Sequence, residues 1–388
     1  MSNIPETACS LLWTHAALDM DGAVMPCCRF QVEMVIDPVT GDAPRQDSRM
    51  YKNPDYKKEN IPYMNEGGLD KAFNGDEYTQ MREAMLRGEK LKGCAKCWEI
   101  ENSGGVDSPR QFWNRRYFDQ IGKPPKIKYL ELGFSTHCNL ACRMCSPEYS
   151  SKWHNIVFPE HKVEVGFTDF IKNLDADLSE VENIKFVGGE PMMDKNHDRF
   201  IENLEAWGIN LSKLNLFYHT NGTIMPGDNV IRVWEKLANV TIVISIDGYG
   251  EVNEYHRPGH KFSDLEKNLL RYKELPVKIE THTVVTQLNV FYLQSLIDWL
   301  DKMEIDPRRS DFDPSNFPLY LSIRSMDEDK KLKAIKYVEG LSRSDIKPRL
   351  INKIKMDIPE SDGMGDDHVL KVMKPLDEYF GTDTKDYL

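Results

Sequence analysis

Six apolar segments of strand character alternate with amphipathic segments between residues 126 and 325, and this alternation constrains the fold more than any other feature. The sequence VTIVISIDG is almost continuously apolar and β-branched, which is typical of a parallel strand buried on both faces. Strands that alternate with helices predict βα units and a parallel sheet. The predicted helices cover residues 143–156, 194–207, 228–238, 262–274 and 290–303. The predicted strands are the segments 126–134, 183–191, 214–222, 240–248, 277–286 and 318–324.

Six βα units are fewer than the eight that close a full barrel. We therefore predict an α/β fold whose core, residues 121–325, is an open, partial (β/α)6 barrel of parallel strands. In barrels of this kind the site lies at the carboxyl ends of the strands. Polar and glycine-rich motifs follow several of the predicted strands, so the site is expected there.

The two flanking regions have a different character. Residues 1–120 predict a cysteine-rich α+β domain, with a β-hairpin that turns at Asp21–Gly22, a favoured pair for such turns. Helices are predicted over 76–88 and over 98–120, the second broken near SGGVDSP, and residues 37–68 predict a long loop. Residues 326–388 predict a charged helical extension with an acidic loop at 358–367.

Composition excludes several classes of protein. The chain has 388 residues and a formal net charge of −12, which argues against a large nucleic-acid-binding face, because such a face is basic. No apolar run reaches the roughly 18 residues of a membrane span, and the N-terminus lacks the pattern of a signal peptide. We expect a cytoplasmic protein without a membrane partner, in a compartment where thiols stay reduced.

The eight cysteines are unevenly distributed. Five lie in the first quarter of the chain, three lie within residues 138–145, and none follows Cys145. Cys138, Cys142 and Cys145 are separated by three and two residues, in the loop after the first predicted barrel strand. Thiolates select zinc, copper(I) or iron–sulfur clusters, and structural zinc requires four protein ligands. Three thiolates on one loop suit a [4Fe–4S] cube with one iron left open to a small molecule.

This spacing and position resemble the signature of radical S-adenosylmethionine (radical SAM) enzymes. The resemblance implies that Cys138, Cys142 and Cys145 hold a [4Fe–4S] cluster whose open iron binds S-adenosylmethionine. In that family an electron from the cluster cleaves the cofactor, and the resulting 5′-deoxyadenosyl radical abstracts a hydrogen atom from the substrate. The cofactor carries the organic chemistry, while the protein positions and shields it.

Further motifs support the resemblance. Gly188, Gly189 and Glu190, followed by proline, end the second predicted strand and resemble the family's GGEP motif. The resemblance assigns this motif to the methionine ammonium, because glycines allow close approach and a carboxylate pairs with a cation. The ends of later strands are assigned to the cofactor's ribose, carboxylate and adenine. These residues are Thr220, Asn221, Ser245, Asp247 and Val285, with Arg257 as a possible partner of the cofactor carboxylate or simply a surface residue.

One residue departs from the family pattern. The position before the last cysteine of the loop is commonly aromatic in the family and packs near adenine, whereas here it is Met144. Methionine is flexible and polarisable and can fill the same space.

The upstream cysteines resemble a second module. Cys9 and Cys27 flank the predicted hairpin, and Cys94 and Cys97 form a CxxC pair. This pattern resembles the twitch and SPASM modules of some radical SAM enzymes, and implies an auxiliary [4Fe–4S] cluster held by four thiolates. The module precedes the barrel here, although it usually follows it. A four-thiolate zinc site is the alternative. Cys28 is left over as an alternative ligand, a buried small hydrophobe or a hydrogen-atom donor.

Three polar residues follow the CxxC pair. Glu101, Ser108 and Arg110 are interpreted either as contacts to a polar substrate between the two clusters or as helix-capping and surface residues.

The leading functional hypothesis is a radical SAM enzyme that modifies a peptide or protein side chain, since auxiliary modules often accompany peptide maturation in the family. One alternative is a radical SAM enzyme that acts on a small metabolite such as a sugar, amino acid or nucleotide. Another is a non-enzymatic, cysteine-rich zinc adaptor. The family implies a reductant protein such as a flavodoxin or ferredoxin as a partner.

Overall fold

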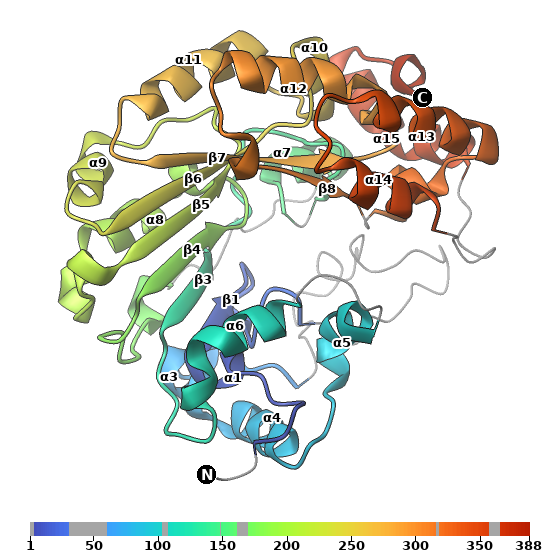
Figure 1. Cartoon of the computed structure of the whole chain (residues 1–388). Helices are drawn as coiled ribbons and strands as arrows, with labels where there is room; N and C mark the ends of the chain where they lie inside the picture. The colour runs from blue at the N-terminus through green and yellow to red at the C-terminus, as the bar shows by residue number, and fades with distance from the viewer. Residues whose placement is uncertain are drawn as a thin grey trace. The chain divides into compact units, whose positions relative to one another are not determined.

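The computed structural model describes residues 4–30, 60–102, 108–147, 149–160, 170–315, 318–356 and 365–388. The chain is α/β, as predicted, and it divides into two compact units, which we describe one at a time (Figure 1). The first unit comprises Met1–His137, Val163–Tyr218 and Pro226–Val240. The second comprises Cys138–Lys162, His219–Met225 and Thr241–Leu388.

The sheet of the first unit has the strand order β2-β1-β3-β4-β5. Its strands are β1 (His15–Leu18), β2 (Val24–Met25), β3 (Tyr129–Gly133), β4 (Asn183–Val187) and β5 (Asn215–Thr220), the last of which ends in the second unit. The predicted hairpin is confirmed, because β1 and β2 pair antiparallel. β1 also pairs in parallel with β3, so that Ala17 lies opposite Glu131. The hairpin thus extends the parallel sheet.

Every second side chain along the strands is apolar and buried, and these side chains form the core of this unit. Ile184 and Phe186 of β4 and Leu216 and Tyr218 of β5 are fully buried, whereas Lys185 between them is partly exposed. Successive side chains of a strand point to opposite faces, so one face of this sheet is apolar and the other is polar. The polar face is available for a site.

Helices of the first unit agree with the sequence pattern. The predicted helix over 76–88 is α4 (Asp76–Leu86), and the broken helix over 98–120 is α5 (Ala95–Asn102) and α6 (Pro109–Tyr117). Ser108 caps α6 through a capping box with Gln111. The other helices are α1 (Leu11–Thr14), α3 (Gly68–Asn74), α8 (Lys195–Glu202) and α9 (Asp228–Trp234).

The second unit contains the other parallel strands. β6 (Asn239–Ser245) begins in the first unit, and it is followed by β7 (Lys278–Val285) and β8 (Ser310–Pro314). Ser245 lies opposite His282, which lies opposite Asp311. The helices of this unit are α7 (Ser151–Val157), α10 (Glu251–His256), α11 (Phe262–Lys273), α12 (Leu293–Lys302), α13 (Glu328–Gly340), α14 (Lys347–Ile354) and α15 (Asp366–Phe380).

Two expected elements of this unit differ from the structure. The sixth strand of the predicted barrel is β8 (Ser310–Pro314). The segment predicted to be that strand, residues 318–324, forms two 3₁₀ turns instead. The helix predicted from residue 143 begins only at Ser151, because Ser150 caps it by accepting the Trp153 N–H and the preceding residues form turns. The helical extension over 326–388 is confirmed by α13, α14 and α15 (Figure 1).

Some predictions fall partly outside the described residues. These are most of the loop at 37–68, the break near SGGVDSP and most of the acidic loop at 358–367. Among the helices that are described, none combines the length and the apolar character that crossing a membrane requires.

Candidate functional site

The three-cysteine loop belongs to the second unit and is held by side chains of its own unit. Cys142 is buried, while Cys138 and Cys145 are partly exposed. The Trp153 indole N–H donates to the Cys142 carbonyl at 2.8 Å, and the Ser150 hydroxyl donates to the Leu140 carbonyl at 2.6 Å. These bonds satisfy buried carbonyl groups of a loop without regular structure and so fix its path.

A buried ion pair contacts the central thiol of the loop. Arg257 Nε lies 2.6 Å from Asp247 Oδ2, and Arg257 Nη1 donates to Cys142 Sγ at 3.6 Å. Burial raises the pKa of the Cys142 thiol, and the Arg257 guanidinium opposes that rise by favouring the thiolate. Asp247 is completely buried and also accepts the Val284 backbone N–H at 2.8 Å. Three residues predicted for the site are therefore brought together.

The end of β5 reaches the same loop within the second unit. The Asn221 amide Nδ2 lies 3.9 Å from Cys138 Sγ and donates to Asn139 Oδ1 at 2.9 Å. Thr220 is buried, and its hydroxyl accepts the Gly222 N–H at 3.0 Å. Asn221 thus contacts the first cysteine of the loop, and Thr220 shapes the turn that presents it.

The remaining predicted residues of this unit lie at strand ends. Ser245 is the last residue of β6 and is partly exposed, whereas Val285 ends β7 and is fully buried. The Val285 carbonyl accepts the Ser315 N–H at 2.8 Å. Met144 packs against an apolar cluster that includes Tyr320 and Met373. The side chain at the position that is commonly aromatic in the family therefore contacts the α15 region.

The glycine motif lies in the first unit and crosses the end of β3 closely. Gly189 N–H donates to the Ser135 carbonyl at 3.0 Å, and Glu190 N–H donates to the His137 carbonyl at 2.7 Å. A Cβ atom on Gly189 would lie 2.3 Å from the His137 carbonyl oxygen, a distance that real contacts do not reach. Gly188 has φ +109°, which disfavours any side chain. The motif is thereby fixed to the segment that ends immediately before Cys138.

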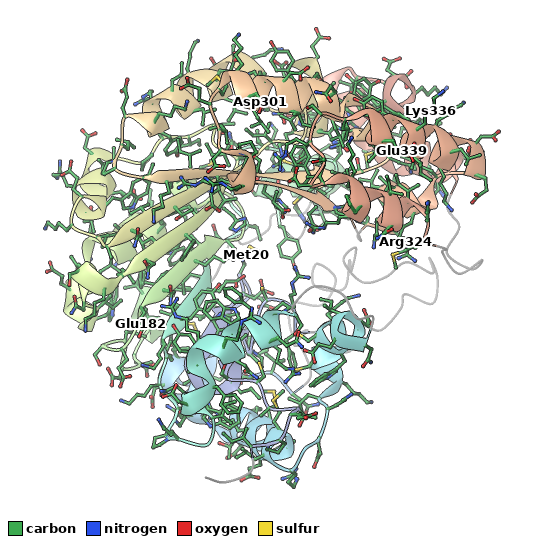
Figure 2. All side chains as sticks on the ribbon, viewed as in Figure 1. Met20, Glu182, Asp301, Arg324, Lys336 and Glu339 are labelled. Atoms are coloured by element: carbon green, nitrogen blue, oxygen red, sulfur yellow. The ribbon has the colours of Figure 1, made fainter. Side chains whose placement is uncertain are left out.

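Glu190 and Met20 complete this corner of the first unit. Glu190 is buried, and its carboxylate accepts the Met192 N–H at 3.2 Å. Met20, in the turn between β1 and β2 (Figure 2), lies against the glycines, since a Cβ on Gly188 would be 3.2 Å from Met20 Sδ and one on Gly133 3.2 Å from Met20 Cγ. Sequence reasoning missed Met20, because its contacts are with strands far along the chain.

The four auxiliary cysteines interact with one another in the first unit. Burial raises the pKa of Cys9 to about 12, and the neighbouring Cys97 raises it further. Burial likewise raises the pKa of Cys94 to about 12, with added increases from Cys9 and Cys97. The pKa of Cys27 is also raised, first by burial and then by Cys28, Cys9 and Cys94. These pairwise interactions place the four thiols near one another, and their role as ligands of one cluster stays a prediction. Among the described residues, no three His, Cys, Asp or Glu side chains form a group suited to one metal ion.

Residues after the CxxC pair anchor this group. Arg110 pairs with Glu101 at 2.5 Å, donates to the carbonyls of Glu6 and Ala8, and lies 4.6 Å above the Trp98 ring. The Ser108 hydroxyl donates to the same Glu101 carboxylate. These contacts engage the three polar side chains with one another. The structure therefore supports the capping interpretation of Ser108 and gives Arg110 the role of holding the Cys9 segment.

Cys28 interacts with Cys27 and with polar side chains of β3 and β4. Burial raises its pKa to about 11, and its charged neighbours are Glu131 and Lys185, with a hydrogen bond to Glu131. Cys27 interacts with Cys28 and also, unlike Cys28, with Cys9 and Cys94. The structure thus favours Cys27 as the fourth auxiliary thiol.

A polar layer on the inner strands was missed by the sequence analysis. Lys185 Nζ lies 3.4 Å from Glu131 Oε1, and the Tyr129 hydroxyl donates to Glu131 Oε2 at 3.4 Å. The His15 ring contacts the Tyr129 ring in a tilted arrangement, with 4.2 Å between the ring centroids. A glutamate and a lysine inside otherwise apolar strands were the signal that marks this face.

Comparisons with protein families agree with the geometry. Residues 132–300 match the model of the radical SAM superfamily, and residues 9–98 match that of the SPASM iron–sulfur cluster-binding domain. Residues 132–300 therefore form a radical SAM domain, and residues 9–98 form a SPASM domain. The first domain implies a [4Fe–4S] cluster and S-adenosylmethionine, and the second implies an auxiliary iron–sulfur cluster. The match order confirms that the auxiliary module precedes the radical SAM region.

Individual relatives are distant. The chain is 28% identical over 168 residues to GTP 3′,8-cyclase of Clostridium botulinum, covering 40% of this chain and 47% of that one. It is 28% identical over 182 residues to the radical SAM cyclopropyl synthase TigE of Paramaledivibacter caminithermalis, covering 44% and 37%. The chain therefore spans about half the length, or less, of these curated relatives.

Two proteins of known structure match part of the chain at low similarity. anSMEcpe with bound AdoMet is 19% identical, with a TM-score of 0.40, and the match covers 54% of this chain and 58% of that one. SuiB of Streptococcus suis bound to the precursor peptide SuiA is 16% identical, with a TM-score of 0.40, and the match covers 66% and 58%.

Proposed function

We propose that this radical SAM chain is an enzyme that reductively cleaves S-adenosylmethionine and abstracts a hydrogen atom from a peptide or protein side chain. The observation that carries the proposal is the loop of Cys138, Cys142 and Cys145, with the Arg257–Asp247 pair buried against its central thiol. Soft thiolates on one loop, with a cation that favours the thiolate state, fit an iron–sulfur cluster.

The residues assigned to S-adenosylmethionine form sets, and each set is proposed to bind a different chemical group of that cofactor. Backbone groups of Gly188 and Gly189 allow close approach, and the Glu190 carboxylate suits the methionine ammonium. Polar side chains at the strand ends suit the ribose and carboxylate, and Val285 suits adenine through its backbone. The polar set is Thr220, Asn221, Ser245, Asp247 and Arg257.

When bound, the cluster and S-adenosylmethionine supply an electron and a 5′-deoxyadenosyl radical that removes a hydrogen atom from a C–H bond. Arg257 favours the thiolate of Cys142 and so opposes the rise in its pKa that burial causes, and Asp247 neutralises Arg257 so that a lone buried cation is avoided. Trp153 and Ser150 hold the loop backbone that carries the thiols.

The auxiliary thiols Cys9, Cys27, Cys94 and Cys97 are proposed to hold the second cluster. Four thiolates close all four iron sites of a cube, so this cluster would transfer electrons or support the fold rather than bind substrate. A flavodoxin or ferredoxin is the proposed reductant partner. Zinc at these four thiols remains the second candidate.

A peptide is proposed as the substrate because a SPASM match accompanies the radical SAM match. The Glu131–Lys185 pair adds a polar surface to the inner strands, where a backbone amide or a charged side chain can bind. A small metabolite is the alternative, since a curated relative is named for GTP.

Iron content tests the cluster assignment. We expect about eight irons per chain and as many sulfides after anaerobic reconstitution, because two [4Fe–4S] clusters are proposed. The Cys94→Ala/Cys97→Ala double variant is expected to retain about four, since only the loop cluster remains. Four irons plus one zinc in the unaltered chain would assign the auxiliary thiols to zinc. No iron at all would contradict the radical SAM proposal.

Isotope transfer tests the substrate class. Peptides and metabolites with deuterium at C–H positions are offered to the reconstituted enzyme, and the 5′-deoxyadenosine product is analysed by mass spectrometry. Deuterium from a peptide is the expected result. Transfer from metabolites alone would overturn the peptide assignment while leaving the enzyme class intact.

A further inference from the structure

Arg143 is a completely buried cation inside the three-cysteine loop. It follows Cys142 directly, and its guanidinium lies 3.9 Å from the centroid of the Tyr255 ring. Nε donates to the Tyr255 carbonyl at 2.9 Å, and Nη2 lies 2.8 Å from Asp377 Oδ1. Nη2 also donates to the Thr382 hydroxyl at 2.7 Å. The loop is thus tied to residues at the end of α15.

Asp377 organises those residues. Its Oδ1 accepts the Thr382 hydroxyl at 2.8 Å, and its Oδ2 accepts the Thr384 hydroxyl at 2.7 Å and the Thr384 N–H at 3.0 Å. The Tyr255 hydroxyl donates to the Thr384 hydroxyl at 2.9 Å. One carboxylate therefore gathers Arg143 and the turn that follows α15. We call residues 377–384 the C-terminal clamp.

The clamp is backed by apolar packing. Val369, Met373 and Leu376 of α15 are fully buried in a cluster against which Met144 and Cys145 of the loop pack. Apolar packing alone can bury such a face, and a buried ion pair gains little over well-packed apolar residues because of its desolvation cost. The ion pair between the buried Arg143 and the partly exposed Asp377 instead specifies one geometry of the loop.

We infer that the C-terminal clamp positions the three-cysteine loop of the cluster site. Within it, Asp377 and Arg143 are positioning residues for the loop thiols. The inference rests on the proposed function and extends it, because the clamp lies outside the radical SAM match of residues 132–300. The clamp fixes the backbone between Cys142 and Cys145 before a cluster binds. Removing its charge loosens the thiols without removing any ligand.

The test is the Asp377→Asn variant of the full chain, which keeps the side-chain shape and removes the counter-charge of Arg143. In the metal-free protein, we expect alkylation of Cys142 by iodoacetamide, followed by peptide mass spectrometry, to become severalfold faster. In the reconstituted protein, we expect an altered electron paramagnetic resonance spectrum of the reduced loop cluster and a weakened response of that spectrum to added S-adenosylmethionine.

Asp366→Asn is the matched control. Asp366 begins the same helix and pairs with Lys330 at 2.6 Å, without contacting the loop. It removes one ion pair from α15, so it reports general loosening of the helix. We expect wild-type alkylation and wild-type spectra. Equal behaviour of the Asp377 and Asp366 variants would overturn the inference.

A milder variant tests the inference if the Asp377→Asn protein does not fold. Thr384→Val keeps the shape and removes only the hydroxyl bonds to Asp377 and Tyr255. We expect a smaller change in the same direction, and wild-type alkylation in this variant would count against the clamp. If the unaltered protein shows no spectral response to S-adenosylmethionine, the proposed function fails, while the alkylation comparison still decides the inference.

Discussion

Replacing Cys142 by alanine is expected to reduce S-adenosylmethionine cleavage to background while leaving the fold largely intact. Cys142 is the buried, central thiol of the loop, and Arg257 donates to its sulfur. Loss of one of three ligands removes the cluster that the proposed reaction needs. The folded state loses only a small buried group, for which a cost of about 1 kcal/mol is expected.

Product analysis measures this effect directly. The reconstituted variant is incubated with reductant and S-adenosylmethionine, and 5′-deoxyadenosine is quantified alongside iron content and the thermal unfolding midpoint. Cys28→Ala is the control, because that thiol interacts with Glu131 and is not assigned to either cluster. We expect wild-type iron content in the control. Wild-type cleavage by the Cys142 variant would refute the assignment of the loop.

Gly189→Ala is expected to produce the second large effect, a loss of S-adenosylmethionine binding with reduced stability. The new Cβ would lie 2.3 Å from the His137 carbonyl oxygen and 2.7 Å from the carbonyl carbons of Thr136 and His137. All three are backbone atoms, so rotation of a side chain cannot relieve the clash. The backbone must shift beside Cys138, and overpacking of this kind costs roughly 1–3 kcal/mol.

Calorimetric titration of the reconstituted protein with S-adenosylmethionine tests the binding loss, and thermal unfolding of the same variant tests stability. Gly340→Ala is the control, because nothing lies within 4 Å of a Cβ at that helical position. The control is expected to bind as the wild type does and to be at least as stable, since alanine favours helix. Unchanged affinity in the Gly189 variant would show that the glycine motif does not bind the cofactor.

The barrel strands and their motifs were predictable because the relevant signals are local. β6 is a continuous apolar run, and βα alternation places the motifs GGEP, TNG and SIDG at carboxyl ends of parallel strands. The gathering of Cys9, Cys27, Cys94 and Cys97 was likewise predictable from spacing, since metal-binding thiols occur in recurring patterns.

Other elements depend on tertiary contacts that no local pattern records. β8 carries aspartates at alternate positions, so it is less apolar than segment 318–324, whose buried residues instead form 3₁₀ turns. α7 starts late because Ser150 caps it while its hydroxyl also holds the Leu140 carbonyl. Apolar content alone does not distinguish a strand from a buried turn.

The candidate site also combines residues that local motifs predict with contacts that only the folded chain shows. The loop thiols and Asp247 were identified from motifs, but the pairing of Asp247 with Arg257 against Cys142 required coordinates. The bond from Arg143 to Thr382 spans 239 residues of sequence. These residues become neighbours only when the chain folds, so the local sequence around each of them does not predict the pairing.

The parallel pairing of β1 with β3 has an evolutionary consequence. The polypeptide between Cys9 and Cys27 supplies a strand of the sheet, with Leu18 opposite Leu132. A recombination event that removed this segment would leave the backbone of β3 with an open edge, which invites aggregation. Loss of the auxiliary module would therefore also change the barrel sheet, because the exposed edge of β3 would need another segment to cover it.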